Sequence, residues 1–223
     1  MRDEVQRSVG LPKAAEPRAA LTLLGQHGET ESQSLGAWSR DLHWVCGVLL
    51  RSVRRRCDCL HWQVPSDMNA AQLQRQWQVF LAQQWPIMVA QLRPLWRLAQ
   101  ARDLAGLMAA DQALAFENGL SQRSLRAGHL AAQGSRGALH LGLLGRLREA
   151  IEQGQTPGHW LVVWAAIGSA YSMSWVALFG EALRLEWLMG TRSMPGAASE
   201  PPQWEQAVSA VAGLEGHELQ ALP

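Results

Sequence analysis

The uncharged stretch from Gln153 to Gly180 constrains the fold of this chain more than any other feature. Pro157 suits the first position of a helix, where its missing N–H has no helical partner to lose, and Thr156 can cap that helix. The apolar and aromatic side chains that follow are three or four residues apart, which places them on one helical face. They are Trp160, Trp164, Ile167, Tyr171, Trp175 and Leu178. The pattern predicts a helix over about 157–189.

The same stretch is long enough to cross a bilayer, which takes roughly 20 residues. Trp160 and Trp175 also lie near its two ends, as interfacial anchors do. However, the stretch contains several small polar residues, and its apolar side chains gather on one side, whereas a helix that faces lipid is apolar all round. These features argue against a membrane span. A helix buried in a bundle and a helix lying along an apolar surface are the favoured alternatives, and a membrane anchor over Trp160–Gly180 is the third.

Four further helices are predicted upstream, over about 38–62, 67–100, 103–133 and 138–153. In the first, apolar residues share one face at Trp38, Leu42, Val45, Leu49 and Val53. In the second, they do so at Leu73, Trp77, Phe80, Leu81, Trp85, Met88, Leu92 and Leu95.

Several residues suit the ends and breaks of these helices. Ser66 or Asp67 can cap the second helix, and Asp103 can cap the third. Pro86 and Pro94 lie inside the second helix, so we expect a kink or break at each.

These elements predict an all-α fold, since no segment has the pattern of a strand. We expect residues 37–193 to form an elongated bundle or antiparallel helical hairpins. Residues 1–36 are expected to be poorly ordered, and residues 194–223 to form a linker and an acidic tail. The stretch from Met194 onward carries four acidic residues and no Lys or Arg, with a short helix predicted around Trp204, Val208 and Val211.

Composition excludes several classes of protein. Apolar residues make up 48% of the chain, which is too many for a disordered protein. Twenty basic and 19 acidic residues leave a net charge of +1, so the whole chain has no electrostatic attraction to nucleic acid. Three cysteines cannot all pair within one chain, and the N-terminus lacks the apolar run of a secretory signal. We therefore expect a cytoplasmic protein.

One cluster of residues could ligate a metal ion, namely His43, Cys46, Cys57, Cys59 and His61. Structural zinc sites favour two residues between cysteines, and on a helix Cys57 and Cys59 would point about 200° apart. We therefore expect thiols beside exposed histidines at a helix end and assign no metal, although whether these residues bind one stays open.

The local run of arginines between Arg51 and Arg56 fits a solvated helix face or a site for acidic partners, and we expect no nucleic acid. No catalytic motif is present in the sequence. We therefore expect neither an enzyme nor a cofactor.

The middle of the chain resembles the phasins, amphipathic helical proteins that coat bacterial polyhydroxyalkanoate granules. The resemblance begins at Leu95–Ala101, continues through Arg102–Met108, and extends along the Ala- and Gln-rich helix from Ala115–Asn118 to Leu130–Gln133. Unlike phasins, this chain is poor in Lys and its stripes are rich in Trp.

A weaker resemblance is to the accessory subunit of two-component polyhydroxyalkanoate synthases. It lies in the Trp-rich helix with Trp77, Trp85 and Trp96, and in Trp164–Leu183 with Phe179. Together the two resemblances cover about residues 70–190, and neither family supplies a catalytic residue.

The phasin resemblance implies a structural, granule-associated protein that binds an apolar surface through its tryptophans. The residues expected to bind are Trp77, Trp85, Trp96, Trp160, Trp164, Ile167, Tyr171, Trp175 and Leu178. The alternative is an all-α accessory or chaperone-like protein that binds a partner protein through the same helix faces. A homo-oligomer would also use such faces, because both an exposed stripe and a buried one require this spacing.

Overall fold

The computed structural model describes residues 47, 50–57, 60–65, 67–114, 119–135, 142–194, 201–204 and 206–207. Within these ranges the regular secondary structure is entirely α-helical, which confirms the predicted all-α fold class. The helices are α3 (Arg51–Arg56), α4 (Ala70–Gln83), α5 (Trp85–Gln100), α6 (Leu104–Ala113), α7 (Leu120–Gly134), α8 (Leu143–Glu152), α9 (Trp160–Ala170) and α10 (Trp175–Gly190). The predicted N-terminal segment, residues 1–36, lies outside the description.

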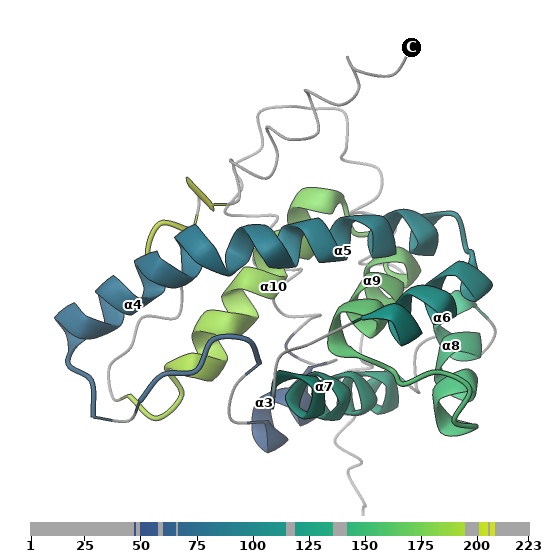
Figure 1. Cartoon of the computed structure of the whole chain (residues 1–223), viewed down its shortest axis with the longest axis horizontal. Helices are drawn as coiled ribbons and strands as arrows, with labels where there is room; N and C mark the ends of the chain where they lie inside the picture. Colours follow the sequence, from purple (N-terminus) through teal and green to yellow (C-terminus); the bar gives the residue numbers. More distant parts are fainter. Residues whose placement is uncertain are drawn as a thin grey trace, which may run out of the picture.

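The helix predicted over 67–100 divides at Gln84 into α4 and α5, which follow one another across the molecule (Figure 1). Pro86 takes the second position of α5, where its missing N–H breaks no bond within that helix, and Pro94 lies inside α5. The cap of α4 is Asn69 rather than Asp67, because the Asn69 side chain accepts a bond from the Gln72 N–H and the Gln72 side-chain oxygen accepts one from the Asn69 N–H.

The helix predicted over 103–133 is likewise two helices. Asp103 caps α6 as expected, accepting a hydrogen bond of 2.8 Å from the Gly106 N–H. α6 ends at Ala113, and α7 begins after Gly119, whose φ of +84° favours glycine. α8 corresponds to the helix predicted over 138–153, of which residues 138–141 lie outside the description.

The helix predicted over 157–189 is interrupted by a turn at residues 171–174, which separates α9 from α10. Ser172 has a φ of +52°, and the Ser174 side chain caps α10 by accepting from the Ala177 N–H. The predicted start was wrong as well. α9 begins at Trp160 with His159 at the N-cap position, and the Thr156 hydroxyl bonds Asp111 instead of capping the helix.

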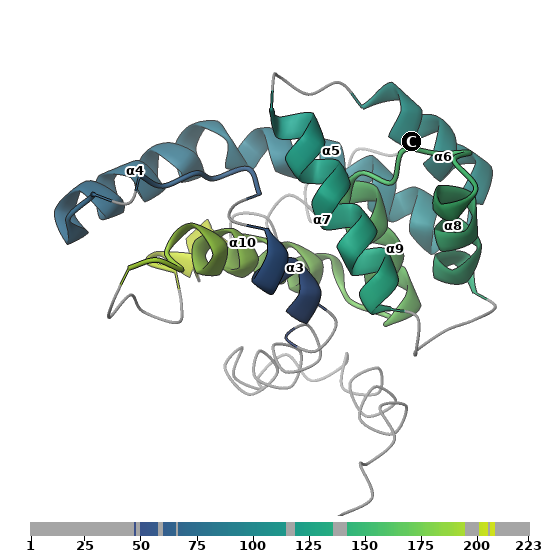
Figure 2. The ribbon, with the colours of Figure 1, turned by 90° about the horizontal axis from the view of Figure 1, so that it is seen from below.

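The helix predicted over 38–62 ends at Arg56, since Cys57 has an extended backbone and residues 60–65 are not helical. Val53 from that predicted stripe is buried, and Trp38, Leu42, Val45 and Leu49 lie outside the description. In Figure 2, α3 lies beside α7, and these two helices are in contact.

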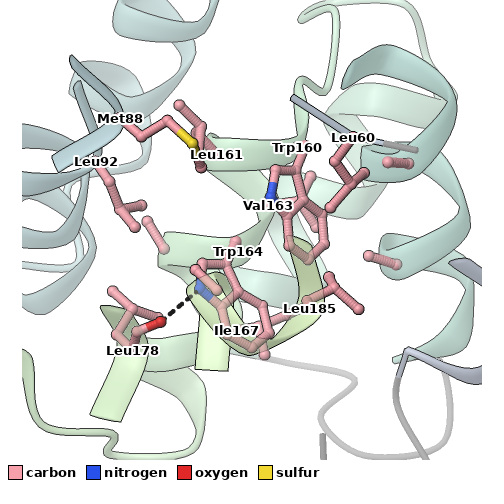
Figure 3. Packing of buried hydrophobic residues seen from close by; sticks show 14 of the residues in the cluster. Leu60, Met88, Leu92, Trp160, Leu161, Val163, Trp164, Ile167, Leu178 and Leu185 are labelled. Atoms are coloured by element: carbon pink, nitrogen blue, oxygen red, sulfur yellow. Dashed lines mark hydrogen bonds between the residues drawn. The ribbon is translucent and has the colours of Figure 1, made fainter. Parts of the chain in front are cut away.

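The core is built around α9, whose residues from Trp160 to Gly168 are all buried. α5, α7 and α8 pack against it from different sides (Figures 1 and 2). Figure 3 shows Leu161 of α9 beside Met88 of α5 and Ile167 beside Leu185 of α10. Across the described residues, no helix combines the length and the apolarity that a bilayer crossing requires.

Candidate functional site

The residues predicted to bind a surface lie in the interior. Trp96 is half-buried, whereas the other eight are buried: Trp77, Trp85, Trp160, Trp164, Ile167, Tyr171, Trp175 and Leu178. The sequence left open whether this stripe is exposed or buried, and in the described fold it is buried because other helices cover it. A binding role for these side chains stays a prediction, and it would require the bundle to open.

Aromatic contacts join elements that are distant in sequence. Trp62, which lies between α3 and α4, stacks on Trp187 of α10 with ring centroids 5.5 Å apart. It also meets Trp77 of α4 edge-on at 4.7 Å. Trp160 stacks on Trp164 within α9, and the Trp164 indole N–H donates to the Leu178 carbonyl at 3.0 Å (Figure 3). These indole rings therefore form contacts between segments that are distant in sequence.

A buried carboxylate forms the first polar cluster. Asp111 of α6 is 0% exposed and accepts hydrogen bonds from the Gly158 N–H at 2.6 Å and the His159 N–H at 3.0 Å. The Thr156 hydroxyl donates to it at 2.5 Å. Asp111 therefore satisfies backbone donors at the start of α9, as a capping residue does, although it belongs to another helix. An acidic residue within an Ala-rich predicted helix was the only sequence signal for it.

His159 lies beside this carboxylate. Burial lowers the pKa of His159 below its ordinary value of 6.5. The charge of Asp111 raises this pKa in part, and His129 lowers it further. His129 is itself bound to the loop, with Nε2 at 2.8 Å from the Pro157 carbonyl oxygen. The Asp111 carboxylate accepts hydrogen bonds from three donors in the loop between α8 and α9, residues 156–159. The cluster therefore holds this loop in place.

α7 also approaches this loop very closely. A Cβ added at Gly128 would lie 2.0 Å from the Gly158 carbonyl oxygen, so only glycine fits there. One turn before Gly128 on α7, the Ser124 hydroxyl accepts from the N–H of Trp160, the first residue of α9, at 3.1 Å.

A second buried carboxylate, Glu186 of α10, holds the segment before α4. It is 0% exposed, and its Oε2 accepts from the backbone N–H groups of His61 and Trp62, each at 3.0 Å. Its Oε1 lies 2.6 Å from the Nδ1 atom of His61.

Of the predicted cluster of metal ligands, Cys57 and His61 are described, while His43, Cys46 and Cys59 lie outside the description. The described residues contain no group of three or more His, Cys, Asp or Glu side chains that could hold a metal ion.

The segment after α10 returns to the helices. The Trp77 indole N–H donates to the Pro202 carbonyl at 2.9 Å, and the Trp204 indole N–H donates to the Gly180 carbonyl at 3.1 Å. The Arg184 guanidinium lies over the Trp204 ring at 4.7 Å from its centroid and pairs with Glu181 at 2.7 Å. Residues 201–204 are therefore bound against α4 and α10.

Large apolar side chains are exposed on the outer side of α4 and α5. Val79 is 46% exposed and Ile87 is 53% exposed, and they are the large exposed apolar residues among those described. At 3.6 residues per turn, six exposed residues between positions 76 and 90 lie within an arc of about 100° on these two helices, and Gln72, Pro94 and Arg97 continue this arc at either end. We call this set the outer face, and its members are Gln76, Val79, Gln83, Pro86, Ile87 and Ala90.

The six residues of the outer face are uncharged, and Arg97 continues the same side of α5. Residues 70–100 contain three arginines, Arg75, Arg93 and Arg97, and no Asp, Glu or Lys. Pro94 provides no N–H for the carbonyl oxygen of Ala90, and Ala90 is exposed. This face therefore offers apolar contacts, amide groups and a carbonyl acceptor.

The arginine run of the sequence forms α3. Arg54, Arg55 and Arg56 are exposed, and the Arg192 side chain donates to the Arg54 carbonyl at 2.8 Å.

No protein-family model, no curated protein and no solved structure matches this chain. The phasin resemblance and the weaker synthase-subunit resemblance therefore stay predictions from the sequence.

Proposed function

We propose that this protein is a non-catalytic helical protein that binds a partner protein through the outer face of α4 and α5. The observation that carries the proposal is the exposure of Val79 and Ile87 on one uncharged face, whereas the described tryptophans are buried or half-buried. The surface is thus a different one from the tryptophan stripe that the sequence suggested.

The energy available to such a surface is modest. Complete burial of a Val or Ile side chain contributes about 1.5–3 kcal/mol, so completing the burial of these half-exposed side chains contributes about 1 kcal/mol each. Both together would change affinity by roughly 30-fold, since 1.4 kcal/mol is a factor of ten. Arg75 at the edge favours a partner that has apolar side chains flanked by acidic ones.

A non-catalytic function is supported by the two buried carboxylates. Asp111 and Glu186 each receive backbone N–H donors, and each joins segments far apart in the sequence. Such bonds engage the lone pairs that a general base would use.

The test is affinity capture with cross-linking from cells that express the chain, comparing wild type with the double variant V79E/I87E. The control pair Ala109→Glu and Gln133→Glu adds the same charge at exposed helical positions on α6 and α7. We expect a stoichiometric partner with wild type and control that the double variant loses. An unchanged set of captured proteins in all three samples would contradict the proposal.

A granule-coating function, as the phasin resemblance implies, is a second proposal. It is favoured by the number of indoles in the interior, because a bundle that opened on an apolar surface would present them together. Tryptophan emission should then shift when polyester granules are added to purified protein. A spectrum that does not change, together with protein that stays in the supernatant, would contradict it.

A further inference from the structure

The face proposed to bind a partner has a candidate ligand in the same chain. We propose that residues 208–223 bind the outer face of α4 and α5 and compete there with the partner protein. The competition rests on the proposed function, whereas the intramolecular contact can be tested without any partner.

The first support is the position of residues 201–207, which directly precede the proposed segment. Bonds from Trp77 to Pro202 and from Trp204 to Gly180 bind the chain beside α4 and α10 immediately before this segment. The Ala207 N–H donates to the Gln203 carbonyl at 3.0 Å, so a helical turn begins there, in agreement with the helix predicted around Trp204. As a helix, residues 208–223 would be about 24 Å long, and Val79 and Ile87 are about 12 Å apart along their helices at 1.5 Å per residue.

The second support is chemical complementarity. The segment has apolar residues at helical spacing, Val208, Val211 and Leu214, followed by Glu215 and Glu218, and it contains no Lys or Arg. The outer face has apolar side chains at its centre and belongs to a stretch whose ionisable residues are all arginines. An acidic amphipathic helix on this face would cover Val79 and Ile87 and bring its acids near Arg75.

The test uses the full chain, a chain that ends at Ala207, and a labelled peptide of residues 208–223 measured by fluorescence anisotropy. We expect the peptide to bind the shortened chain and to bind the full chain roughly tenfold more weakly, because a tethered segment competes at an effective concentration in the millimolar range. Binding should weaken as salt is raised. The V79E/I87E pair in the shortened chain should reduce binding at least tenfold, and the Ala109→Glu and Gln133→Glu pair should not.

Hydrogen exchange gives a readout that needs no substitution. Amides between Val79 and Ala90 should exchange faster in the shortened chain than in the full chain, and the added peptide should restore their protection. Equal exchange in both chains, no peptide binding to the shortened chain, or equal binding by both chains would each overturn the inference. A partner that V79E/I87E loses, without peptide binding, would leave the proposed function standing and remove only this intramolecular contact.

Discussion

Replacing Asp111 by Ala should destabilise the protein far more than the same change at Asp103. Both carboxylates serve as helix caps, but Asp111 is 0% exposed and accepts from Thr156, Gly158 and His159. Asp103 is exposed and accepts one backbone bond, from Gly106. The pair therefore compares one substitution in a buried and in an exposed environment.

The magnitude follows from the donors left behind. Without the carboxylate, the buried N–H groups of Gly158 and His159 lose their partner, and each unsatisfied donor costs about 1–3 kcal/mol. The Thr156 hydroxyl can rotate to another acceptor, and removing a buried charge returns part of its desolvation cost. We expect a loss of about 3 kcal/mol for Asp111→Ala and about 1 kcal/mol for Asp103→Ala, the usual cost of an exposed cap.

The measurement is equilibrium unfolding in urea, followed by tryptophan fluorescence and by far-UV circular dichroism, with a common m-value for the three proteins. Asp111→Asn keeps one acceptor oxygen and should fall between wild type and the Ala variant. If Asp111→Ala costs no more than Asp103→Ala, then the bonds at the start of α9 do not stabilise the fold, and the capping argument fails.

Three further predictions concern stability. The pKa of His159 is lowered in the folded state, so the unfolded chain binds more protons at mildly acid pH. His159 should therefore make the free energy of unfolding fall as pH decreases from about 6.5 toward the folded pKa, and the urea midpoint of His159→Gln should vary less over that window than that of wild type. Gly128→Ala should cost about 3 kcal/mol or more of stability, because its Cβ would clash with the Gly158 carbonyl. A melting temperature within about 2 °C of wild type would refute the close contact between α7 and this loop. Glu186→Gln keeps one acceptor oxygen for the backbone N–H donors but weakens the bond to the His61 ring. Urea unfolding should therefore show a free energy of unfolding lower by about 1–2 kcal/mol, and an unchanged value would contradict the role of that bond.

Local features of the fold could be predicted from the sequence because they depend on neighbouring residues. The 3.6-residue spacing of apolar side chains predicts helices throughout the described chain, and Asp103 caps α6 as its position indicates. The predicted disturbance near Pro86 corresponds to the division between α4 and α5. In each case the physical cause lies within one turn of the chain.

The interruption at residues 171–174 could not be predicted in this way. The spacing of Trp164, Ile167, Tyr171, Trp175 and Leu178 is regular across it. The indole of Trp164 nevertheless donates to the Leu178 carbonyl across the turn, a contact that a single straight helix could not make. Contacts across the turn, such as those of Trp164 and Gly168 with Leu178, are tertiary contacts, and tertiary contacts outweigh the local preference for one long helix.

The sequence by itself determined that the described part of the chain is helical and that helices such as α4 and α5 have an apolar side. Only the tertiary structure decided what covers that side. Trp160 and Trp164 are buried in α9, against which α5, α7 and α8 pack, while Val79 of α4 and Ile87 of α5, in helices with similar spacing, stay exposed. The physical reason is that apolar periodicity is the same whether a face meets another helix or solvent, so burial depends on residues such as Asp111 and Glu186 that join distant segments.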